Sequence, residues 1–299
     1  MTADRFEECA ELLERSKQYR VLRKLPDTNC YNPPPKEMPQ VGVYVDIETT
    51  GLNPGVDKII ELAMVSFEFL SDGRIFRILD RYDAFNDPGF DLPEGIVKLT
   101  GITDEMVRGQ SIDVEHIRSI LDKTVVVIAH NATFDRVFLE SFFPEFETKA
   151  WACSMKDIPW AEEGFEGTKL EYLAWRCGFF FEGHHAITDC AAGIHLLSKT
   201  LPKSGDPALK RMLDSARQKE YRIWAEGSPY EAKDVLKSRG YRWNSGENRQ
   251  PRSWYNDIPS ERLKEEIIFL QTQIYGSEVE LRVDVITAFN RYSSRVTGP

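Results

Sequence analysis

A short alternating segment that ends in two acids constrains the fold more than any other part of this 299-residue chain. In Val43–Gly51, with the sequence VYVDIETTG, apolar and polar residues alternate as they do in a β-strand. A strand directs residues i and i+2 to one face, so Asp46 and Glu48 share a face while Val45 and Ile47 share the other. Two carboxylates held this close repel each other unless a cation lies between them, and carboxylate oxygens suit Mg²⁺ or Mn²⁺. The pair therefore predicts half of a metal site on a strand.

The composition is typical of a globular protein with one full domain and a smaller one. Hydrophobic residues make up 41% of the chain and charged residues 29%, which are ordinary values. No apolar run approaches the roughly 20 residues of a membrane helix, and the N-terminus has no signal-peptide pattern, so we expect a cytoplasmic protein that does not bind membranes. The five cysteines are scattered without a Cys-x-x-Cys pair, which indicates neither a disulfide framework nor a zinc site.

The net charge of −10 is unevenly distributed along the chain. Residues 41–202 carry 14 Lys and Arg against 27 Asp and Glu, whereas residues 203–299 carry 17 against 14. Bound cations would offset part of the central excess. The overall charge therefore does not exclude a nucleic-acid partner.

Apolar periodicity divides the chain into three parts. Residues 1–40 combine a helix expected over 4–24 with a Pro-rich extended arm. Residues 41–202 show short strands and then alternating strands and helices, which indicates an α/β fold with a mixed sheet covered by helices. Residues 203–299 are expected to form a small α+β module after a linker at 203–207. The expected strands are 41–47, 59–70, 75–82, 125–129 and 279–286; the expected helices are 112–121, 133–143, 169–177, 186–201, 208–223, one starting at Ser228, and 259–275.

Two further acids lie where active residues of α/β sheets are common. Asp135 follows the apolar strand that ends at Ala129, in the first turn of the next helix. Asp189 lies five positions after His184. If a helix begins near Ala186, Asp189 lies in its first turn and His184 on the preceding loop, so both side chains can reach one point.

This set of residues resembles the DEDD-type 3′-5′ exonucleases of the ribonuclease H-like fold, in their histidine variant. The sequences DIETTGL, LTGIT, AHN and KLEYL resemble the same family, which includes proofreading epsilon subunits of DNA polymerase III and ribonuclease T. The resemblance covers about residues 41–200. One departure is WACS at residues 151–154, where many members carry Asp-Thr. The family pattern Asp-x-Glu, Asp, His-x(4)-Asp is matched by Asp46, Glu48, Asp135, His184 and Asp189.

The resemblance implies hydrolysis with two metal ions. Asp46, Glu48 and Asp189 would hold the ion that activates water. Asp46 would bridge to a second ion, on which Asp135 would act directly or through water. His184, with an ordinary pKa of about 6.5, would take the proton of the attacking water.

Other residues of the site leave alternatives open. His185 is an alternative base to His184, and His130 is expected to be structural rather than catalytic. The resemblance implies that side chains after the first motif lie against the terminal nucleotide and that those of the second motif flank the next part of the strand. Phe134 could equally be helix core. The expected substrate-binding residues are Thr49, Thr50, Leu52, Asn131 and Phe134.

Residues 237–255 interleave five cations and one acid with aromatic side chains. Such a pattern is typical of a surface that follows phosphates and stacks on bases, so we expect this module to help grip nucleic acid. The alternative is that Tyr241, Trp243, Trp254 and Tyr255 form a small hairpin core while the arginines are solvated.

The leading function is a metal-dependent 3′-5′ exonuclease that acts on DNA, foremost on single-stranded ends, and releases nucleoside 5′-monophosphates. Two Mg²⁺ are the expected cofactors, with Mn²⁺ able to substitute. RNA end trimming and proofreading beside a polymerase are alternatives. The 2′-hydroxyl distinguishes RNA from DNA, and no residue indicates whether the site accepts it. A polymerase or a second copy of the chain is an open partner. A non-catalytic binding protein and a phosphohydrolase of small nucleotides are the competing classes; the complete motif argues against the first and the basic aromatic module against the second.

Overall fold

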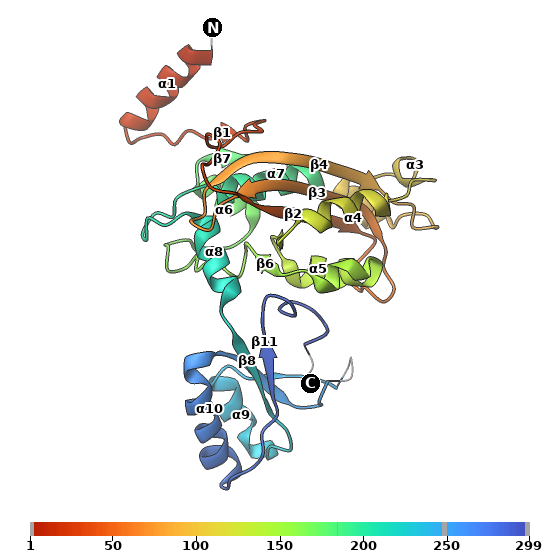
Figure 1. Ribbon diagram of the computed structural model, residues 1–299, viewed down its shortest axis with the longest axis vertical. Coiled ribbons are helices and arrows are strands. Elements are labelled where there is room, and N and C mark those ends of the chain that lie inside the picture. The colour runs from red at the N-terminus through yellow and green to blue at the C-terminus, as the bar shows by residue number, and fades with distance from the viewer. Residues whose placement is uncertain (1–2, 184, 247–249, 297–299) are drawn as a thin grey trace.

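The computed structural model describes residues 3–183, 185–246 and 250–296. A five-stranded sheet with helices on both faces forms the larger part of the molecule, and a four-stranded sheet with its own helices lies below it (Figure 1). The fold is therefore a ribonuclease H-like α/β architecture with a smaller α+β module at the C-terminus.

The larger sheet has the strand order β4-β3-β2-β5-β6. β2 is antiparallel to β3, and β3 to β4, whereas β5 runs parallel to both β2 and β6. β5 is the continuous apolar run of the sequence, and all four of its residues are buried because helices cover both faces. The strands are β2 (Gln40–Thr49), β3 (Ile59–Phe69), β4 (Ile75–Phe85), β5 (Val126–Ala129) and β6 (Trp151–Cys153).

The alternation of β2 divides the core into two layers. Val43, Val45 and Ile47 pack on the side of α4 and α5, and Tyr44 packs on the side of α7 and α8. The helices of the first side are α4 (Val114–Lys123) and α5 (Ala132–Phe142); those of the second side are α6 (Leu170–Arg176), α7 (Ala186–Leu197) and α8 (Ala208–Arg217); the short helices are α2 (Glu94–Thr100), α3 (Asp104–Val107) and η1 (Pro144–Thr148).

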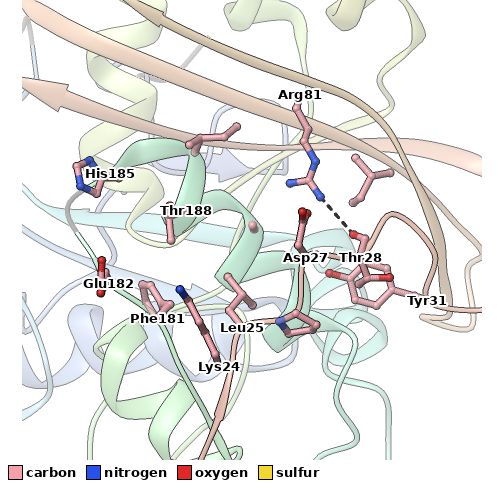
Figure 2. A pocket seen from close by; sticks show the side chains of 14 residues that line it. Lys24, Leu25, Asp27, Thr28, Tyr31, Arg81, Phe181, Glu182, His185 and Thr188 are labelled. Atoms are coloured by element: carbon pink, nitrogen blue, oxygen red, sulfur yellow. Dashed lines mark hydrogen bonds between the residues drawn. The ribbon is translucent and has the colours of Figure 1, made fainter. Parts of the chain in front are cut away.

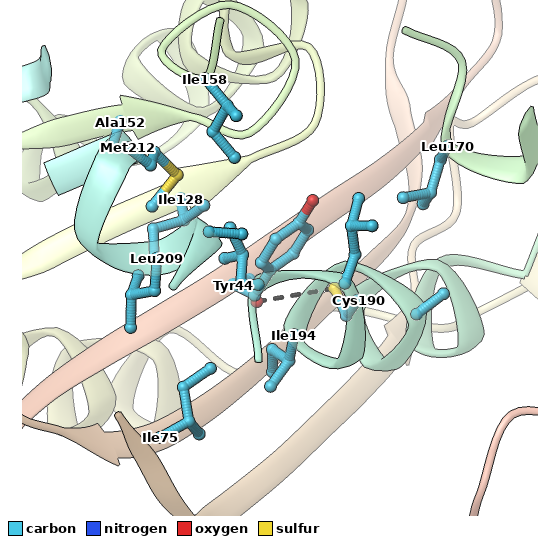
Figure 3. Packing of buried hydrophobic residues seen from close by; sticks show 14 of the residues in the cluster. Tyr44, Ile75, Ile128, Ala152, Ile158, Leu170, Cys190, Ile194, Leu209 and Met212 are labelled. Atoms are coloured by element: carbon cyan, nitrogen blue, oxygen red, sulfur yellow. Dashed lines mark hydrogen bonds between the residues drawn. The ribbon is translucent and has the colours of Figure 1, made fainter. Parts of the chain in front are cut away.

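Helix α7 approaches β2 unusually closely. A Cβ atom at Gly193 would lie 2.1 Å from the Tyr44 ring, so only glycine allows this separation. Three residues earlier, the Cys190 thiol donates to the Tyr44 carbonyl at 3.5 Å (Figure 3). These contacts fix the start of α7, which carries Asp189, against the strand that carries Asp46.

The N-terminal segment forms a short helix and then a strap along the larger domain. The helix expected over 4–24 is shorter, because α1 spans only Ala3–Arg15. The chain then pairs as β1 (Arg23–Lys24) in parallel with β7 (Phe179–Phe180). The two-stranded sheet thus uses the last residues of the range expected to be helical, and the Pro-rich arm follows it.

The C-terminal sheet has the order β11-β8-β10-β9. The helix expected over 208–223 was wrong at its end: α8 stops at Arg217, and β8 follows because residues 221–225 alternate between a helix-covered face and an open face. The elements are β8 (Glu220–Ala225), η2 (Tyr230–Ala232), α9 (Lys233–Ser238), β9 (Arg242–Trp243), β10 (Trp254–Pro259), η3 (Ser260–Arg262), α10 (Leu263–Phe269), η4 (Leu270–Tyr275) and β11 (Val283–Ile286).

Buried polar contacts join the chain's last segment to α5. The Arg136 guanidinium donates to the Arg291 carbonyl at 2.7 Å and to Glu140 at 2.6 Å. Glu140 also accepts from the Ser293 hydroxyl at 2.6 Å and from Arg295 at 2.7 Å. The segment after β11 therefore returns to the larger domain and holds the module against it.

Helix α8 packs into the core of the larger sheet through its residues between Ala208 and Ala216. The division of the chain after residue 202 stays a prediction, and this packing favours a later boundary. In the part of the chain that the structure describes, no helix is both long and apolar enough to cross a membrane.

Candidate active site

Strand β2 supplies the first two carboxylates of the site. Asp46 and Glu48 alternate with the buried Val45 and Ile47, as expected for a strand. Asp46 lies opposite Ala63 on β3, and Glu48 lies opposite an acid, Glu61. The register shifts immediately after Glu48, so the carboxylates lie where the strand pairing is interrupted.

Asp135 and Asp189 reach the same place from two helices. Asp135 lies in the first turn of α5 and is 4% exposed, and Asp189 lies in the first turn of α7. Burial raises the pKa of Asp46 well above its ordinary value, and the charges of Asp135, Asp189 and Glu48 raise it further. The charges of the three other predicted carboxylates thus act on Asp46.

The electrostatics of this cluster favour a bound cation. Burial raises the pKa of Asp135 to about 7, Glu48 adds to the rise, and hydrogen bonds from backbone N–H groups oppose it. An all-oxygen donor set of carboxylates fits a hard divalent cation, which would lower these pKa values again. As the side chains lie, no three His, Cys, Asp or Glu groups among the described residues form a metal-binding set.

Two acids that the sequence reasoning missed adjoin the cluster. Glu61 is 3% exposed, and burial, together with the charge of Asp83 on β4, raises its pKa to about 8. Glu61 accepts from the backbone N–H of Ala186 at 3.4 Å, at the first residue of α7. The signal was present in the sequence, since Glu61 is the only acid within the apolar run IIELAMV.

The predicted base, His184, lies outside the described residues. Its neighbours define where the loop runs: a Cβ atom at Gly183 would lie 3.7 Å from an Asp189 carboxylate oxygen. His185 is the exposed N-cap residue of α7, and its side chain makes no capping hydrogen bond. The described part of this loop, at Gly183, therefore passes beside Asp189.

The N-terminal arm lies against this loop. A pocket of about 290 Å³ is enclosed by arm residues from Lys24 to Tyr31 on one side and by His185 and Thr188 on the other (Figure 2). Arg81 on β4 donates to the Thr28 carbonyl at 3.2 Å and so fastens the arm to the sheet. The arm thus forms one wall beside the histidine loop.

His130 is partly buried, and both of its ring nitrogens have hydrogen-bond partners. Burial lowers its pKa, so the ring is neutral at pH 7. Its Nε2 faces the Thr168 carbonyl at 2.7 Å, and a carbonyl only accepts, so Nε2 carries the proton. Nδ1 then accepts from the Ser154 hydroxyl at 2.9 Å, and Ser154 accepts from the Tyr44 hydroxyl at 2.8 Å. Ser154, at the departure from the family's Asp-Thr, thus ties β6 to β2.

The predicted substrate residues after β2 fall into two groups. Thr49 and Thr50 are each 6% exposed, and their hydroxyls donate to the Gly51 carbonyl at 2.6 Å and to Asp57 at 3.2 Å. Leu52 is 85% exposed beside them. The threonines therefore shape the turn, and Leu52 presents an apolar surface to a ligand.

The residues at the start of α5 differ in the same way. Asn131 is exposed at the N-cap position, without a capping hydrogen bond from its side chain. Phe134 is half-buried and packs on Phe138 with ring centroids 5.0 Å apart. The Asn131 side chain is accessible from solvent. The Phe134 ring packs partly against the core and is partly accessible.

The basic aromatic segment of the module is partly core and partly surface. Tyr241 is buried and donates to Glu266 at 2.9 Å, and Arg239 donates to the same carboxylate at 3.0 Å. Arg242 and Trp243 are exposed. Some residues of the segment thus belong to a small core and others to the surface, so each of the two alternatives describes part of it. Arg249 lies outside the described residues.

Comparisons with known proteins point to one family. The model of the Exonuclease family (RNase_T) matches residues 43–197, just over half of the chain. A PolC-type DNA polymerase III of Pediococcus pentosaceus is 34% identical over 170 residues, which is 52% of this chain and 11% of that protein. The corresponding protein of Halalkalibacterium halodurans is 42% identical over 163 residues, again 52% of this chain and 11% of that protein. The chain thus matches about a tenth of the length of these polymerases.

Two solved structures are also similar. Exonuclease X in complex with 5′ overhanging duplex DNA is 24% identical, covers 58% of this chain and 98% of its own, and has a TM-score of 0.44. Escherichia coli exonuclease I in complex with a dA16 oligonucleotide is 16% identical, covers 77% of this chain and 68% of its own, and has a TM-score of 0.48. On the match of the family model to residues 43–197, together with the sheet order and the acids at β2, the chain belongs to the Exonuclease family and is a DEDD-type 3′-5′ exonuclease of the ribonuclease H-like fold.

Proposed function

We propose that this exonuclease removes nucleotides from single-stranded 3′ ends of DNA, by the histidine variant of the mechanism, and releases nucleoside 5′-monophosphates. The observation that carries the proposal is the gathering of carboxylates from β2, α5 and α7 around Asp46, which raises the pKa of Asp46. Such a cluster is costly to fold and is explained by the charge that it binds.

Exonucleases of this family generally use divalent metal ions, and Asp46, Glu48, Asp135 and Asp189 would hold two of them, Mg²⁺ or Mn²⁺. When bound, such a pair polarises the phosphate and supplies a hydroxide nucleophile near neutral pH. Asp46 would be the central ligand, because the charges of the other three act on it. Asp135 is buried at the start of α5.

His184 is the proposed base that takes the proton of the attacking water, with His185 as the alternative. An imidazole titrates near pH 6.5 and can accept a proton at neutral pH. Two observations support a histidine near the cluster: His184 follows Gly183, where a Cβ atom would lie 3.7 Å from Asp189, and His185 is the N-cap residue of α7. Replacing each histidine separately by Gln distinguishes the two: the base is the one whose loss lowers kcat and removes the acidic limb of the pH profile.

The 3′-terminal nucleotide would lie against Leu52 and the backbone of the turn that Thr49 and Thr50 hold. Asn131 and the accessible part of Phe134 would flank the next nucleotide. Apolar and aromatic side chains stack on any base, which gives tolerance of sequence. The exposure of Leu52 supports this role. Its side chain is 85% exposed, so a ligand that covers it removes apolar surface from water, which favours binding.

DNA is the preferred substrate class because the relatives of 34% and 42% identity are named as DNA polymerases. Their exonuclease segment belongs to a longer polymerase, so proofreading beside a polymerase partner is the second candidate. A measurement of molecular mass in solution tests whether two copies of the chain form a dimer.

One degradation assay tests the proposal. End-labelled single-stranded DNA, duplex DNA and RNA of one sequence are incubated with Mg²⁺ and then with a chelator. We expect stepwise shortening from the 3′ end, fastest on single-stranded DNA, and complete loss of activity with the chelator. Faster cleavage of RNA would overturn the substrate class, and activity that survives chelation would overturn the metal site.

A further inference from the structure

The C-terminal sheet has one covered face and one face that carries cations and aromatic rings. Tyr221, Ile223 and Ile258 pack beneath α9 and α10. On the opposite face the Tyr255 ring lies between two guanidinium groups, with Arg222 at 4.5 Å and Arg242 at 4.9 Å from its centroid. Guanidinium groups over aromatic rings are the surface that nucleic-acid strands meet in proteins that bind without sequence preference.

This face opens into a cleft that the exonuclease domain completes. The cleft has a volume of about 450 Å³, and the cationic face forms one wall. Thr133 and Lys156 form part of the other wall, and the Lys156 ammonium donates to the Thr133 hydroxyl at 2.6 Å. Thr133 is exposed in the first turn of α5, two residues before the buried Asp135, so the cleft and the carboxylates lie on different faces of the same helical turn.

The two walls are held in a fixed relation by buried contacts. Tyr292 donates to Asp157 at 2.6 Å and Arg291 donates to it at 3.4 Å, and Lys156 is the neighbour of Asp157. The Lys156 ammonium also lies 5.5 Å from the centre of the Tyr292 ring. The cleft is therefore a constant feature of the molecule and can serve as a path for a strand.

The cations that line the cleft are not fully neutralised by carboxylates of the protein. Arg222 binds Asp257 with two hydrogen bonds, of 2.6 and 2.9 Å, and its side chain is only 13% exposed. Arg242 shares the same carboxylate at 2.9 Å, but its side chain is 60% exposed. One carboxylate thus faces two guanidinium groups, and the exposed Lys156 donates to a neutral hydroxyl. A phosphate can displace Asp257 from Arg242 at little cost, because exposed ion pairs are weak.

We propose that this cleft binds the part of a nucleic-acid strand that lies 5′ of the nucleotide being removed. Lys156 and Arg242 contact its phosphates from opposite walls, and Tyr255 offers a ring face when Arg242 moves to a phosphate. The inference rests on the proposed function, because it places the strand whose 3′ end lies at Asp46. It predicts that affinity depends on strand length while hydrolysis at the end does not.

The test combines a charge reversal on each wall with two substrates. The double variant Lys156→Glu, Arg242→Glu is compared with Lys264→Glu, which changes an exposed lysine on α10, away from the cleft. A 20-nucleotide strand and the p-nitrophenyl ester of thymidine 5′-monophosphate are hydrolysed with Mg²⁺. We expect KM for the strand to rise about tenfold or more in the double variant, with kcat on the ester within twofold of the unchanged protein.

Salt dependence provides the second readout. Loss of two phosphate contacts should reduce the slope of log Kd against log salt by roughly 1 to 2, and Lys264→Glu should leave it unchanged. Lys156→Ala with Arg242→Gln gives a milder variant if the reversed charges hinder folding, and thermal unfolding verifies that each variant is folded. DNA and RNA strands of one sequence are both titrated.

The outcomes separate the two proposals. An unchanged KM and salt slope in a folded double variant overturns the cleft as the strand path, even if both substrates are cleaved. Equal losses in Lys264→Glu would show general charge attraction and would also overturn it. Failure of the unchanged protein to cleave either substrate is a failure of the proposed function instead.

Discussion

The acids on the two sheets of this chain differ in the charges that surround them. On the C-terminal sheet each acid of the open face has an arginine partner: Asp257 pairs with Arg222 at 2.6 Å and Asp284 with Arg282 at 3.3 Å. On the larger sheet Asp46 has other carboxylates around it, and its pKa is raised. The comparison indicates that one face is balanced by its own side chains, whereas the acids of the other raise one another's pKa values. Under the two proposals, the first would meet phosphates directly and the second would reach them through a bound cation.

The largest expected effect follows from removing the central carboxylate. Asp46→Asn should lower the rate of nucleotide release by at least about 10³-fold, because the residue contacts the reacting centre. The variant should be as stable as the unchanged protein at pH 8 or more so, since a repulsive charge is lost. Turnover of end-labelled DNA and urea unfolding measure the two effects. Asp122→Asn, an exposed acid on α4, is the control; a similar loss of activity there would contradict the assignment.

The contact between the two regions should be the next most sensitive point. Arg136 is fully buried, and Arg136→Ala leaves Glu140 and three backbone carbonyls without it. We expect a loss of about 3 to 5 kcal/mol in the free energy of unfolding. Arg118→Ala, which breaks exposed pairs with Glu115 and Glu145, should cost about 0 to 1 kcal/mol. Equal costs would show that the last segment does not hold the regions together.

The pH dependence of stability should report on the buried acids beside the larger sheet. In the unfolded chain Asp and Glu ionise near pH 4, whereas in the folded protein Asp135 keeps its proton to about pH 7 and Glu61 to about pH 8. Between these values the unfolded state binds fewer protons, so stability falls as the pH rises. Without divalent metal, the free energy of unfolding should drop by about 2 to 4 kcal/mol from pH 5 to pH 8. A flat profile by urea unfolding in a chelator would refute the burial of these acids.

The smallest predicted effect tests how closely α7 is held to β2. Gly193→Ala places a methyl group 2.1 Å from the Tyr44 ring, and overpacking of this kind costs about 1 to 3 kcal/mol. Gly95→Ala on α2 is the matched control, because nothing lies within 4 Å of its new methyl group. That change should stabilise the protein by up to about 1 kcal/mol. A neutral Gly193→Ala would show that the helix can move away from the strand.

Much of the site could be predicted from the sequence because its residues follow local rules. Strand alternation gave Asp46 and Glu48 a common face, and position after a strand or at a helix start located Asp135 and Asp189. Glu61 is marked in the sequence as the only acid of its apolar run, but its place beside the site depends on which residue of β3 lies opposite Glu48. The switch from α8 to β8 was missed, since residues 218–223 show helical and strand spacing alike until the neighbouring strands are known. The cleft required the return of the chain after β11, which no local pattern specifies.

The most direct test is the unfolding midpoint at pH 8 as a function of Mg²⁺ concentration, in the unchanged protein and in Asp46→Asn. Binding of a cation to the folded state alone raises the free energy of unfolding by RT ln(1 + c/Kd), where c is the Mg²⁺ concentration, so above Kd the midpoint keeps rising with the logarithm of that concentration. We expect this logarithmic rise in the unchanged protein and no comparable rise in Asp46→Asn. An unchanged midpoint in both proteins, or the same rise in both, would contradict the claim that the carboxylates around Asp46 form the metal site.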